Sequence, residues 1–372
     1  MLIIEACIAS LNTQRVKVMV RKIFIVFMFV SILVSCQNQE NKPIEYDASV
    51  LSSVETLKVS PQNIPSNFSF ADPQQISVLG DSLLVVFDET MNGKFAHVLR
   101  TNGDYVSSFG ERGKAKGEMI NPQNFSIGKD GKSVYFYDYT LTNTIKFNVD
   151  DLLKGNVTPA IVNNHQITDK LINRFNNVWY FSDHSFVGFG YNDKCRILYV
   201  ENNTIQDNYV DYPSLVEDKE CNWSLWNNDA SFVVSPDQKY VVISSGLGMV
   251  FEVLNIENGK ISSHVVKGFY KAVYDVDYST KPACVSYMKD TFEGCGSICV
   301  SDDGFYKCVL GSGPNFDQND IIYFFDYNGN LIKKYKVPNP VVCMSKGKTN
   351  ELYLITVNKN GENSLQKIVL NE

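Results

Sequence analysis

The sequence has few of the residues from which metal centres and nucleophilic active sites are built. Only four histidines occur in 372 residues, and no two of them stand at the spacing of a metal-binding pair. They are His97, His165, His184 and His264. The chain has no Gly-x-Ser-x-Gly elbow and no glycine-rich loop ending in Lys-Ser/Thr. It therefore contains no signal for zinc catalysis, a serine nucleophile or nucleotide binding.

Concentrated positive charge is absent as well. The chain carries 34 Lys and Arg against 41 Asp and Glu, which gives a formal net charge of −7. Its densest basic cluster, at 112–116, is flanked by Glu111 and Glu118, as is typical of a solvated loop. Because nucleic-acid-binding domains carry a basic stripe or patch, we expect no nucleic-acid partner.

Sustained helical periodicity is lacking after the N-terminal region, whereas strand-forming residues are abundant. The chain contains 23 Phe and 20 Tyr. Apolar runs rich in β-branched and aromatic residues recur, for example at 83–87, 134–137 and 240–243. This pattern predicts an all-β fold.

Two kinds of turn alternate along the chain and divide it into repeats. Turns of the first kind lie roughly 50 residues apart, at Gly80-Asp81, Asp130-Gly131, Asp183-His184, Pro236-Asp237, Asp303-Gly304 and Lys346-Gly347. Turns of the second kind lie between them, at Asn102-Gly103, Asp150-Asp151, Asn202-Asn203, Asn258-Gly259 and Asn328-Gly329. Asn-Gly favours a tight hairpin, because both central residues of that turn take positive φ. Each repeat therefore predicts a four-stranded antiparallel meander, which is the unit of a β-propeller.

The last repeat is short, and this bears on how the predicted ring closes. After its second turn only one strand follows, at 364–370, so the repeat has three strands. We expect the strand at 54–59 to complete it, which closes six blades into a ring without open edges. A seven-bladed ring is one alternative, because residues 275–288 can form an extra hairpin. Two β-sandwiches is another, although it does not explain the alternating turns.

The N-terminal region is typical of a secretory signal. Two positive charges precede an apolar run at 23–34, which is shorter than the roughly 20 residues of a transmembrane helix. The tetrad that follows, Leu33-Val34-Ser35-Cys36, resembles the lipobox of bacterial lipoproteins. That resemblance implies cleavage before Cys36 and acylation of this cysteine, for example with palmitate. An uncleaved membrane anchor is the alternative.

We therefore expect three parts in the chain. Residues 1–36 form the signal peptide, and 1–18, which precede Met19, are interpreted as a gene-start artefact. Residues 37–53 form a polar, flexible tether, and residues 54–372 form the propeller. The resemblance implies a bacterial cell-envelope protein held by its lipid, with the outer membrane as the expected location.

The segment 109–147 has a glycine-rich start, Pro122 ahead of an inner strand, an Asp130-Gly131 hairpin and an aliphatic–aromatic strand that ends in Asp138. In these features it resembles an NHL-type propeller repeat. The mature chain as a whole resembles the TolB-like six-bladed propeller lipoproteins of bacteria. This resemblance implies the fold and the exported location, but the family has no single activity.

A propeller binds ligands at the mouth of its central channel, on the loops that lead into the inner strands. By this rule the candidate ligand-binding residues are Gln74, Arg112, Gln123, Asn124, Arg174, Trp223 and Trp226. An exposed tryptophan pair can stack on a sugar or a peptide. The simpler interpretation is that the glutamines bond to backbone where their strands begin and that the tryptophans cover the rim.

We expect no cofactor and no resident metal, with calcium in the channel as the alternative. Propeller lactonases and lyases use carboxylates and amides around a central cation, and calcium prefers such oxygen ligands. Four aspartates lie near the starts of inner strands: Asp72, Asp229, Asp275 and Asp277. Capping of turns and loops explains each of them as well.

The cysteines leave the redox state open. Seven follow the predicted lipidation site: Cys195, Cys221, Cys284, Cys295, Cys299, Cys308 and Cys343. An exported protein can form disulfides, but an odd number leaves at least one thiol unpaired. Buried free thiols on strands are the other interpretation.

The sequence favours a lipid-anchored, non-catalytic binding or scaffolding module. Its expected partners are the membrane, through the lipid, and an envelope protein, peptide or glycan. The alternative is a divalent-cation-dependent lyase or lactonase. That alternative predicts Asp, Asn and Glu side chains from several blades converging on the channel.

Overall fold

The computed structural model describes residues 44–89, 93–162, 175–190, 195–227, 230–280, 283–294, 296–311 and 319–370. Cys36, the predicted signal peptide, Arg174 and Asp229 lie outside the described residues. Among the described residues, no helix is both long enough and apolar enough to cross a bilayer.

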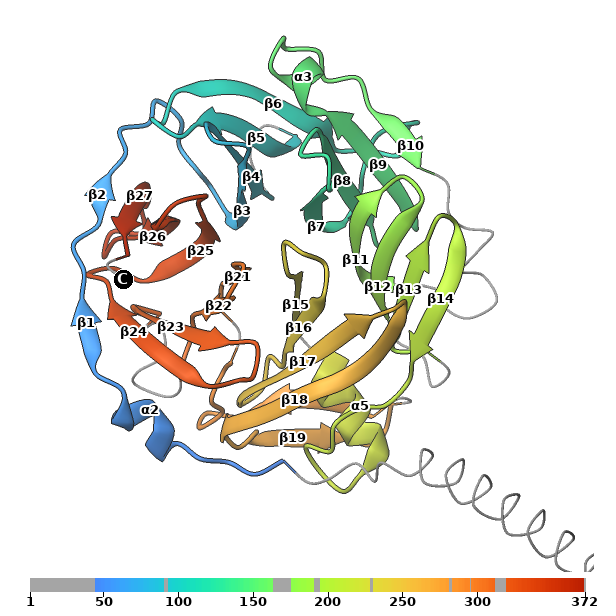
Figure 1. Ribbon diagram of the computed structural model, residues 1–372, viewed down its shortest axis with the longest axis vertical. Helices are drawn as coiled ribbons and strands as arrows, with labels where there is room; N and C mark the ends of the chain where they lie inside the picture. The colour runs from blue at the N-terminus through green and yellow to red at the C-terminus, as the bar shows by residue number, and fades with distance from the viewer. Residues whose placement is uncertain are drawn as a thin grey trace, which may run out of the picture. The chain divides into compact units, whose positions relative to one another are not determined.

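Six antiparallel sheets are arranged as blades around a central axis (Figure 1). The first contains β3 (Pro73–Leu79), β4 (Leu83–Asp88), β5 (Lys94–Arg100) and β6 (Tyr105–Glu111). The second contains β7 (Pro122–Ile127), β8 (Ser133–Asp138), β9 (Asn143–Asn148) and β10 (Ala160–Val162). The third contains β11 (Phe175–Ser182), β12 (Ser185–Gly190), β13 (Ile197–Glu201) and β14 (Thr204–Tyr209). In each blade the chain runs outward from the innermost strand, as the two alternating kinds of turn predict.

The other three blades complete the ring. The fourth contains β15 (Ser231–Val234), β16 (Tyr240–Ser244), β17 (Met249–Glu257) and β18 (Lys260–Tyr270). The fifth contains β21 (Ile298–Val300), β22 (Gly304–Lys307), β23 (Ile321–Asp326) and β24 (Leu331–Lys336). The sixth contains β25 (Val341–Lys346), β26 (Glu351–Val357) and β27 (Asn363–Val369). The prediction of an all-β, six-bladed propeller is confirmed.

The N-terminal segment closes the ring, as predicted, but not with the strand that was expected to do so. The residues predicted to close the sixth blade contain β1 (Thr56–Lys58), which pairs in parallel with β24 of the fifth blade. The sixth blade receives β2 (Gln62–Asn63), antiparallel to β27. The reason is the path of the chain, which passes the outer edge of the fifth blade before it reaches the sixth (Figure 1).

Residues 44–63, here called the N-terminal strap, lie against three blades. Tyr46 forms a bridge with Gly268 of β18, and α2 (Ser49–Ser53) follows it. Leu51 of this short helix is only 8 % exposed, and its carbonyl oxygen accepts a hydrogen bond of 2.5 Å from Lys334 Nζ. The part of the predicted tether from residue 44 onward therefore belongs to the propeller.

An additional hairpin lies between the fourth and fifth blades, in the region where a seventh blade was the alternative. It consists of β19 (Tyr274–Asp277) and β20 (Cys284–Tyr287), which form a separate two-stranded sheet. Two strands do not make a blade, so the blade count stays at six. Among the described residues, two further helices lie in connections: α3 (Val149–Leu152) and α5 (Lys219–Asn227).

Apolar side chains fill the spaces between neighbouring blades. Between the first two blades, Phe109 packs edge-on against Phe147 with ring centroids 4.8 Å apart. Between the fourth and fifth, Phe251 packs edge-on against Phe305 at 5.0 Å. All four rings are at most 2 % exposed. The core is therefore a series of interfaces rather than one central cluster, as expected when strands bury both faces.

Inner strands are also joined by side chains that bond to the backbone of the next blade. Gln75 of β3 bonds twice to Phe125 of β7: its Nε2 donates to the carbonyl at 2.9 Å, and its Oε1 accepts from the N–H at 3.0 Å. Three serine Oγ atoms accept an N–H from a neighbouring inner strand: Ser126 from Tyr180, Ser297 from Met344 and Ser345 from Val78. Four of the blade junctions are thus fixed around the axis.

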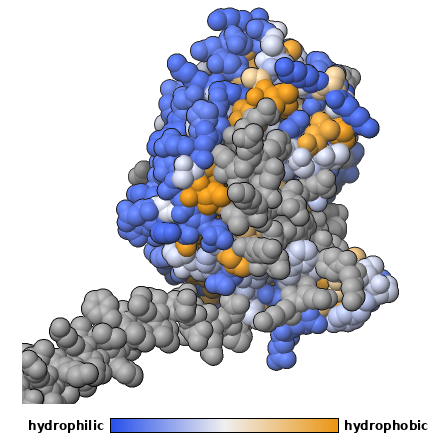
Figure 2. Space-filling model, turned by 90° about the vertical axis from the view of Figure 1, so that its right-hand side faces the viewer, coloured by the Kyte–Doolittle hydropathy of each residue, from blue (hydrophilic) through white to orange (hydrophobic). Residues whose placement is uncertain are grey.

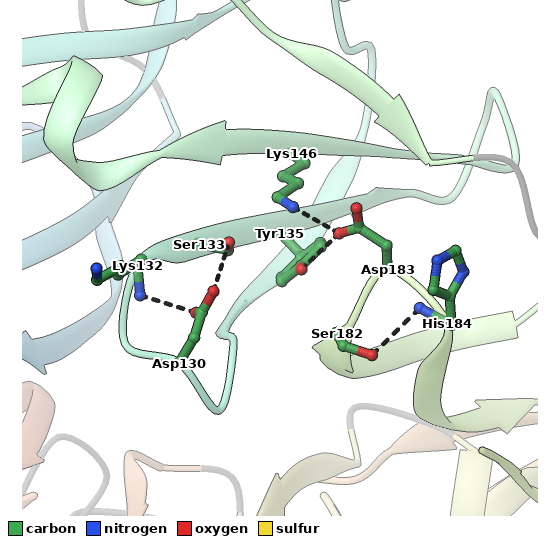
Figure 3. A network of polar contacts seen from close by, with 8 residues as sticks. All are labelled: Asp130, Lys132, Ser133, Tyr135, Lys146, Ser182, Asp183 and His184. Atoms are coloured by element: carbon green, nitrogen blue, oxygen red, sulfur yellow. Dashed lines mark hydrogen bonds and ion pairs between the residues drawn. The ribbon is translucent and has the colours of Figure 1, made fainter. Parts of the chain in front are cut away.

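A charged network joins the second and third blades (Figure 3). It lies at the end of the ring that carries the turns between the first and second strands of each blade. Asp183 Oδ1 accepts hydrogen bonds from Tyr135 Oη and Lys146 Nζ, both at 2.7 Å. Burial alone would raise the pKa of Asp183, but these two hydrogen bonds outweigh it and lower the pKa. The turn signal Asp183-His184 therefore also supplies a contact between blades.

On the side seen in Figure 2, the coloured hydrophobic residues form separate patches among hydrophilic ones. Five described cysteines are buried and Cys284 is exposed, and none of the six forms a disulfide: Cys195, Cys221, Cys284, Cys299, Cys308 and Cys343. These six residues are free thiols, which was one of the two interpretations of the sequence.

Candidate functional site

A cavity of about 890 Å³ lies at the end of the ring where the inner strands begin. Residues of all six inner strands contribute to its wall, together with the 338–340 loop that leads into β25. Its volume lies in the range of pockets that hold small molecules or a short segment of a polymer. This is the position expected for a propeller ligand site, and the cavity is here called the amide cavity.

Neutral polar side chains dominate the polar part of its lining. The amides and hydroxyls are those of Gln74, Gln75, Gln123, Asn124, Asn177, Ser231, Ser297, Asn319, Asn339 and Asn358. Among the described residues that line it, Lys359 alone carries a charge, and no carboxylate is present. The cavity therefore offers many hydrogen-bond donors and acceptors and little charge.

Two buried aspartates set the position of the strands that carry the glutamines. Asp88, at the end of β4, accepts hydrogen bonds from the N–H groups of Ala71 and Asp72 at 2.8 and 2.9 Å. Asp138, at the end of β8, accepts from Asn121 N–H at 2.9 Å. Both aspartates are fully buried. The sequence feature that resembled an NHL repeat, a strand ending in Asp, thus fixes the loop that leads into the preceding inner strand.

Gln74 and Gln123 occupy matching positions in the first and second blades. Gln74 Nε2 donates to Asp72 Oδ1 at 2.7 Å, and Gln123 Nε2 donates to Asn121 Oδ1 at 2.8 Å. Each side chain is exposed, bonds only to its own loop among the described residues, and lines the cavity. Neither carbonyl oxygen has a donor among the described residues, so each is available to a ligand.

Three asparagines of the lining have a buried side-chain oxygen without a hydrogen-bond partner among the described residues: Asn124, Asn177 and Asn319. Asn124 is 8 % exposed and Asn319 is 5 % exposed. The other side of the Asn319 amide is satisfied, because Nδ2 donates to the Val341 carbonyl at 2.6 Å. Buried acceptors without a donor are uncommon in folded proteins, which makes these oxygens candidates for contact with a bound ligand or water.

The cavity contains no activated nucleophile among the described residues. Cys343 belongs to its lining, but burial raises the pKa of this thiol well above the usual value. Because the thiolate is the reactive form, a thiol that stays protonated at neutral pH is a poor nucleophile. Cys343 is therefore not an activated thiol.

The arrangement of acidic side chains can be compared with what a calcium site needs. In the part of the chain that the structure describes, no group of three or more His, Cys, Asp or Glu residues is placed to hold a metal ion. Amide oxygens of the cavity can ligate calcium, but neutral oxygens alone do not compensate its charge. Of the acidic candidates, Asp72 accepts a hydrogen bond from Gln74 of its own loop, while Asp275 and Asp277 lie on the separate hairpin β19–β20.

Three of the sequence candidates lie in the cavity wall and three do not. Gln74, Gln123 and Asn124 line it, as described above. Arg112 is exposed outside it, where its Nη2 donates to the Glu89 carbonyl at 2.7 Å and its guanidinium stacks on Phe95. The remaining candidates outside the wall are the two tryptophans.

Trp223 and Trp226 lie on α5 and are not part of the cavity. Trp226 is fully buried, with Nε1 donating to the Pro213 carbonyl at 2.7 Å and its ring 5.0 Å from the Arg196 guanidinium. It therefore has no surface on which a ligand could stack, and Trp223 is half-buried. The loop is helical because Asp218 caps it, its Oδ1 accepting from Cys221 N–H at 3.0 Å.

Arg196 forms a buried ion pair beneath that helix. Its Nη1 lies 2.6 Å from Glu252 Oε2, and both side chains are fully buried. Burial raises the pKa of Glu252, although the guanidinium opposes this shift. The pair joins the third blade to the fourth and lies outside the cavity, so it is a structural element.

Asn177, Asn319 and Asn339 are cavity residues that the sequence did not indicate. Asn177 lies within β11 of the third blade, and the other two lie in loops without a turn signal of their own. The positions of Asn319 and Asn339 depend on how the fifth and sixth blades pack, which no local pattern encodes. An unusual density of Asn and Gln at starts of inner strands is the one signal that pointed in this direction.

A family model described as TolB-like 6-blade propeller-like matches residues 54–346 of the sequence. The chain belongs to the TolB-like six-bladed propeller family. No curated protein sequence matches it.

Solved structures similar to this propeller share its fold at low sequence identity. A presumed exported protein of Bacteroides fragilis has a TM-score of 0.51 at 11% identity, covering 89% of this chain and 98% of that one. A DUF4221 family member from Bacteroides vulgatus also has a TM-score of 0.51, at 8% identity, covering 85% and 97%. A gluconolactonase of Xanthomonas campestris has a TM-score of 0.49 at 10% identity, covering 89% and 95%. These likenesses concern the fold alone.

Proposed function

We propose that this TolB-like propeller is an exported, non-catalytic binding module whose ligand enters the amide cavity. The observation that carries the proposal is the lining itself, in which amides and hydroxyls from six blades surround one space while its described residues include no carboxylate. General acid–base chemistry needs titratable groups within reach of the reacting atoms. Binding needs only matching donors and acceptors, which this lining supplies.

The chemistry of the lining favours a neutral, hydrogen-bonding ligand. The unpartnered oxygens of Asn124, Asn177 and Asn319 accept hydrogen bonds and cannot donate them. Hydroxyl groups of a glycan and N–H groups of a peptide are donors of the right kind. A ligand that donates to these buried acceptors satisfies them, whereas one without such donors forgoes about 1–3 kcal/mol for each one. Selection of a glycan or peptide segment follows from that difference.

The proposed location is the bacterial cell envelope, with attachment through a lipid on Cys36. Support comes from the apolar N-terminal run, the lipobox-like tetrad and the composition of the signal. The strap begins at residue 44, so at most seven residues separate it from the proposed lipid. Seven extended residues span roughly 25 Å. The fourth blade, where the strap starts, would then stay close to the membrane surface.

A capture experiment tests the proposal. The propeller, residues 43–372, is one compact unit and can be labelled and applied to arrays of glycans and of peptides. We expect saturable capture of a neutral glycan or peptide that survives chelation of divalent cations. Capture that disappears with chelator and returns with calcium would instead support the cation-dependent alternative. Conversion of an arrayed lactone or uronide by the protein would overturn the non-catalytic role.

A further inference from the structure

A second cavity, of about 520 Å³, lies at the opposite end of the ring from the amide cavity. Its wall includes turns that join first and second strands of blades, among them those at Gly80 and Gly347. Most of its remaining wall comes from the facing sides of the fifth and sixth blades. It is here called the blade 5/6 cavity, and its lining differs from that of the amide cavity in carrying both charge signs.

Two buried tyrosines form its floor. Tyr306 of β22 is 5 % exposed and Tyr335 of β24 is 2 % exposed. Tyr306 lies directly opposite Phe324, with the two rings stacked at 4.6 Å, and Phe324 lies opposite Lys333 in turn. This cross-strand row places two phenols and an ammonium group on the same side of the fifth blade.

Neither tyrosine hydroxyl has a hydrogen-bond partner among the described residues, although both side chains line the cavity. Burial raises the pKa of both phenols, so each keeps its proton at neutral pH. A protonated phenol donates one hydrogen bond. The floor of the cavity therefore presents two donors to whatever occupies it.

Lys346 contributes a half-buried cation to the wall. Its Nζ donates to the Gly347 carbonyl at 3.1 Å and also to the Thr349 carbonyl, which uses two of its three N–H donors. None of the ion pairs seen in the described residues includes Lys346. Burial lowers the pKa of this ammonium, while the nearby carboxylates of Asp302, Glu351 and Asp303 oppose the shift without lying at ion-pair distance in the described residues. A partly desolvated cation with no carboxylate in direct contact is stabilised by an anion in the cavity.

We propose that the blade 5/6 cavity binds a small oxyanion, a carboxylate or a phosphate monoester, carried on a hydroxylated molecule. The oxyanion accepts hydrogen bonds from Tyr306 and Tyr335 and pairs with Lys346, since charged acceptors form the strongest such bonds. Asp302 and Asp303 are exposed at the rim, where their oxygens accept hydrogen bonds from the ligand's hydroxyl groups. The volume suits one sugar-sized molecule. This site is independent of the amide cavity and of its proposed role.

Matched sugars that differ only in their anionic group test the proposal. The propeller is titrated calorimetrically with glucuronate, glucose 6-phosphate and glucose, each up to about 10 mM. We expect glucuronate, glucose 6-phosphate or both to bind saturably, and glucose not to bind. Which of the first two binds distinguishes a carboxylate ligand from a phosphate ligand. Absence of binding by both anions, or equal binding of glucose, overturns the proposal.

Variants place the binding in this cavity. In the Tyr306→Phe/Tyr335→Phe double variant both donors are lost while both rings stay, so the affinity should fall at least about tenfold. The control is Tyr323→Phe, because Tyr323 is buried on the other side of the same blade, in the core facing the fourth blade. Its affinity should stay within about twofold of the unsubstituted protein. Undiminished binding by the folded double variant contradicts the assignment.

Discussion

At the scale of single residues, two kinds of buried polar side chain bear on the amide cavity. Asp88 and Asp138 are fully buried and accept backbone hydrogen bonds, so they hold the loops that lead into β3 and β7. Asn124 and Asn319 are nearly as buried, yet each has an oxygen without a partner among the described residues. The first group stabilises the fold, and the second defines where a ligand is expected.

His97 lies outside the amide cavity and makes stability depend on pH. It is 1 % exposed, and its Nδ1 lies 2.7 Å from Ser108 Oγ. Burial lowers the pKa of this imidazole to about 4. The unfolded chain binds a proton here below about pH 6.5, whereas the folded protein does so only near pH 4. The stability that depends on a neutral His97 is therefore fully present above pH 6.5 and is lost as the pH falls from there to 4.

We expect the free energy of unfolding to drop by up to about 3 kcal/mol more in the unsubstituted protein than in His97→Leu between pH 7 and 4. Urea denaturation at a series of pH values measures the difference. His264→Gln is the control, since His264 is exposed. If the free energy of unfolding changes equally with pH in the unsubstituted protein and in His97→Leu, the account of His97 is contradicted.

The sequence was sufficient to locate some cavity residues and not others. Gln74, Gln123 and Asn124 were found because position in a repeat is a local property that turn signals reveal. Asn319 was missed because its loop has no repeat position and is placed only by the packing of two blades. The stacking role considered for Trp226 is wrong, because α5, which Asp218 caps, buries the ring, and no local signal marked that cap.

At the scale of strands and turns, the regular order within each blade follows from local chemistry. Positive φ is observed at Gly103, Asn202, Asn203, Gly259 and Gly329, all in predicted turns of the second kind. Such turns specify hairpins without any long-range information. The partner of an edge strand is different, because it depends on which edge the chain passes first, and so β1 was assigned to the wrong blade.

The contact between β3 and β7 leads to a prediction with a neighbouring control. Gln75→Leu leaves the N–H and the carbonyl of Phe125 without their side-chain partner, so we expect stability to fall by about 1–3 kcal/mol. Gln74→Leu removes only a bond within the exposed loop and should cost less than about 0.5 kcal/mol. Denaturant unfolding of both variants measures the difference. Equal stability of the two variants would show that Gln75 does not join the blades.

At the scale of the whole molecule, the ring is held closed by an N-terminal segment that is far in sequence from the sixth blade, which it completes. β2 supplies the fourth strand of the sixth blade, and Val78 N–H bonds to Ser345 Oγ where the first and last blades meet. The strap continues along the fifth and fourth blades, so it contacts half of the ring (Figure 1). Closure of this kind makes the blades one cooperative unit.

Two shortened chains separate closure from the rest of the strap. A chain that begins at residue 61 loses α2 and β1 but keeps β2, and we expect its melting temperature to fall by about 5 °C. A chain that begins at residue 67 also loses β2. We expect its melting temperature to fall by roughly twice as much, or the chain to unfold in more than one step. Calorimetry measures both. Identical melting of the two chains contradicts the role of β2 in closure.

The central claim is that the ligand binds in the amide cavity, and one paired titration tests it most directly. The glycan or peptide captured on the arrays is titrated against the propeller and against its Gln123→Leu/Asn339→Leu variant, with Gln206→Leu on the outer strand β14 as control. The account predicts that the affinity falls at least about tenfold in the cavity variant and stays within about twofold in the control. Full affinity in the cavity variant, with loss on Trp223→Ala, would contradict the account and move the site to α5.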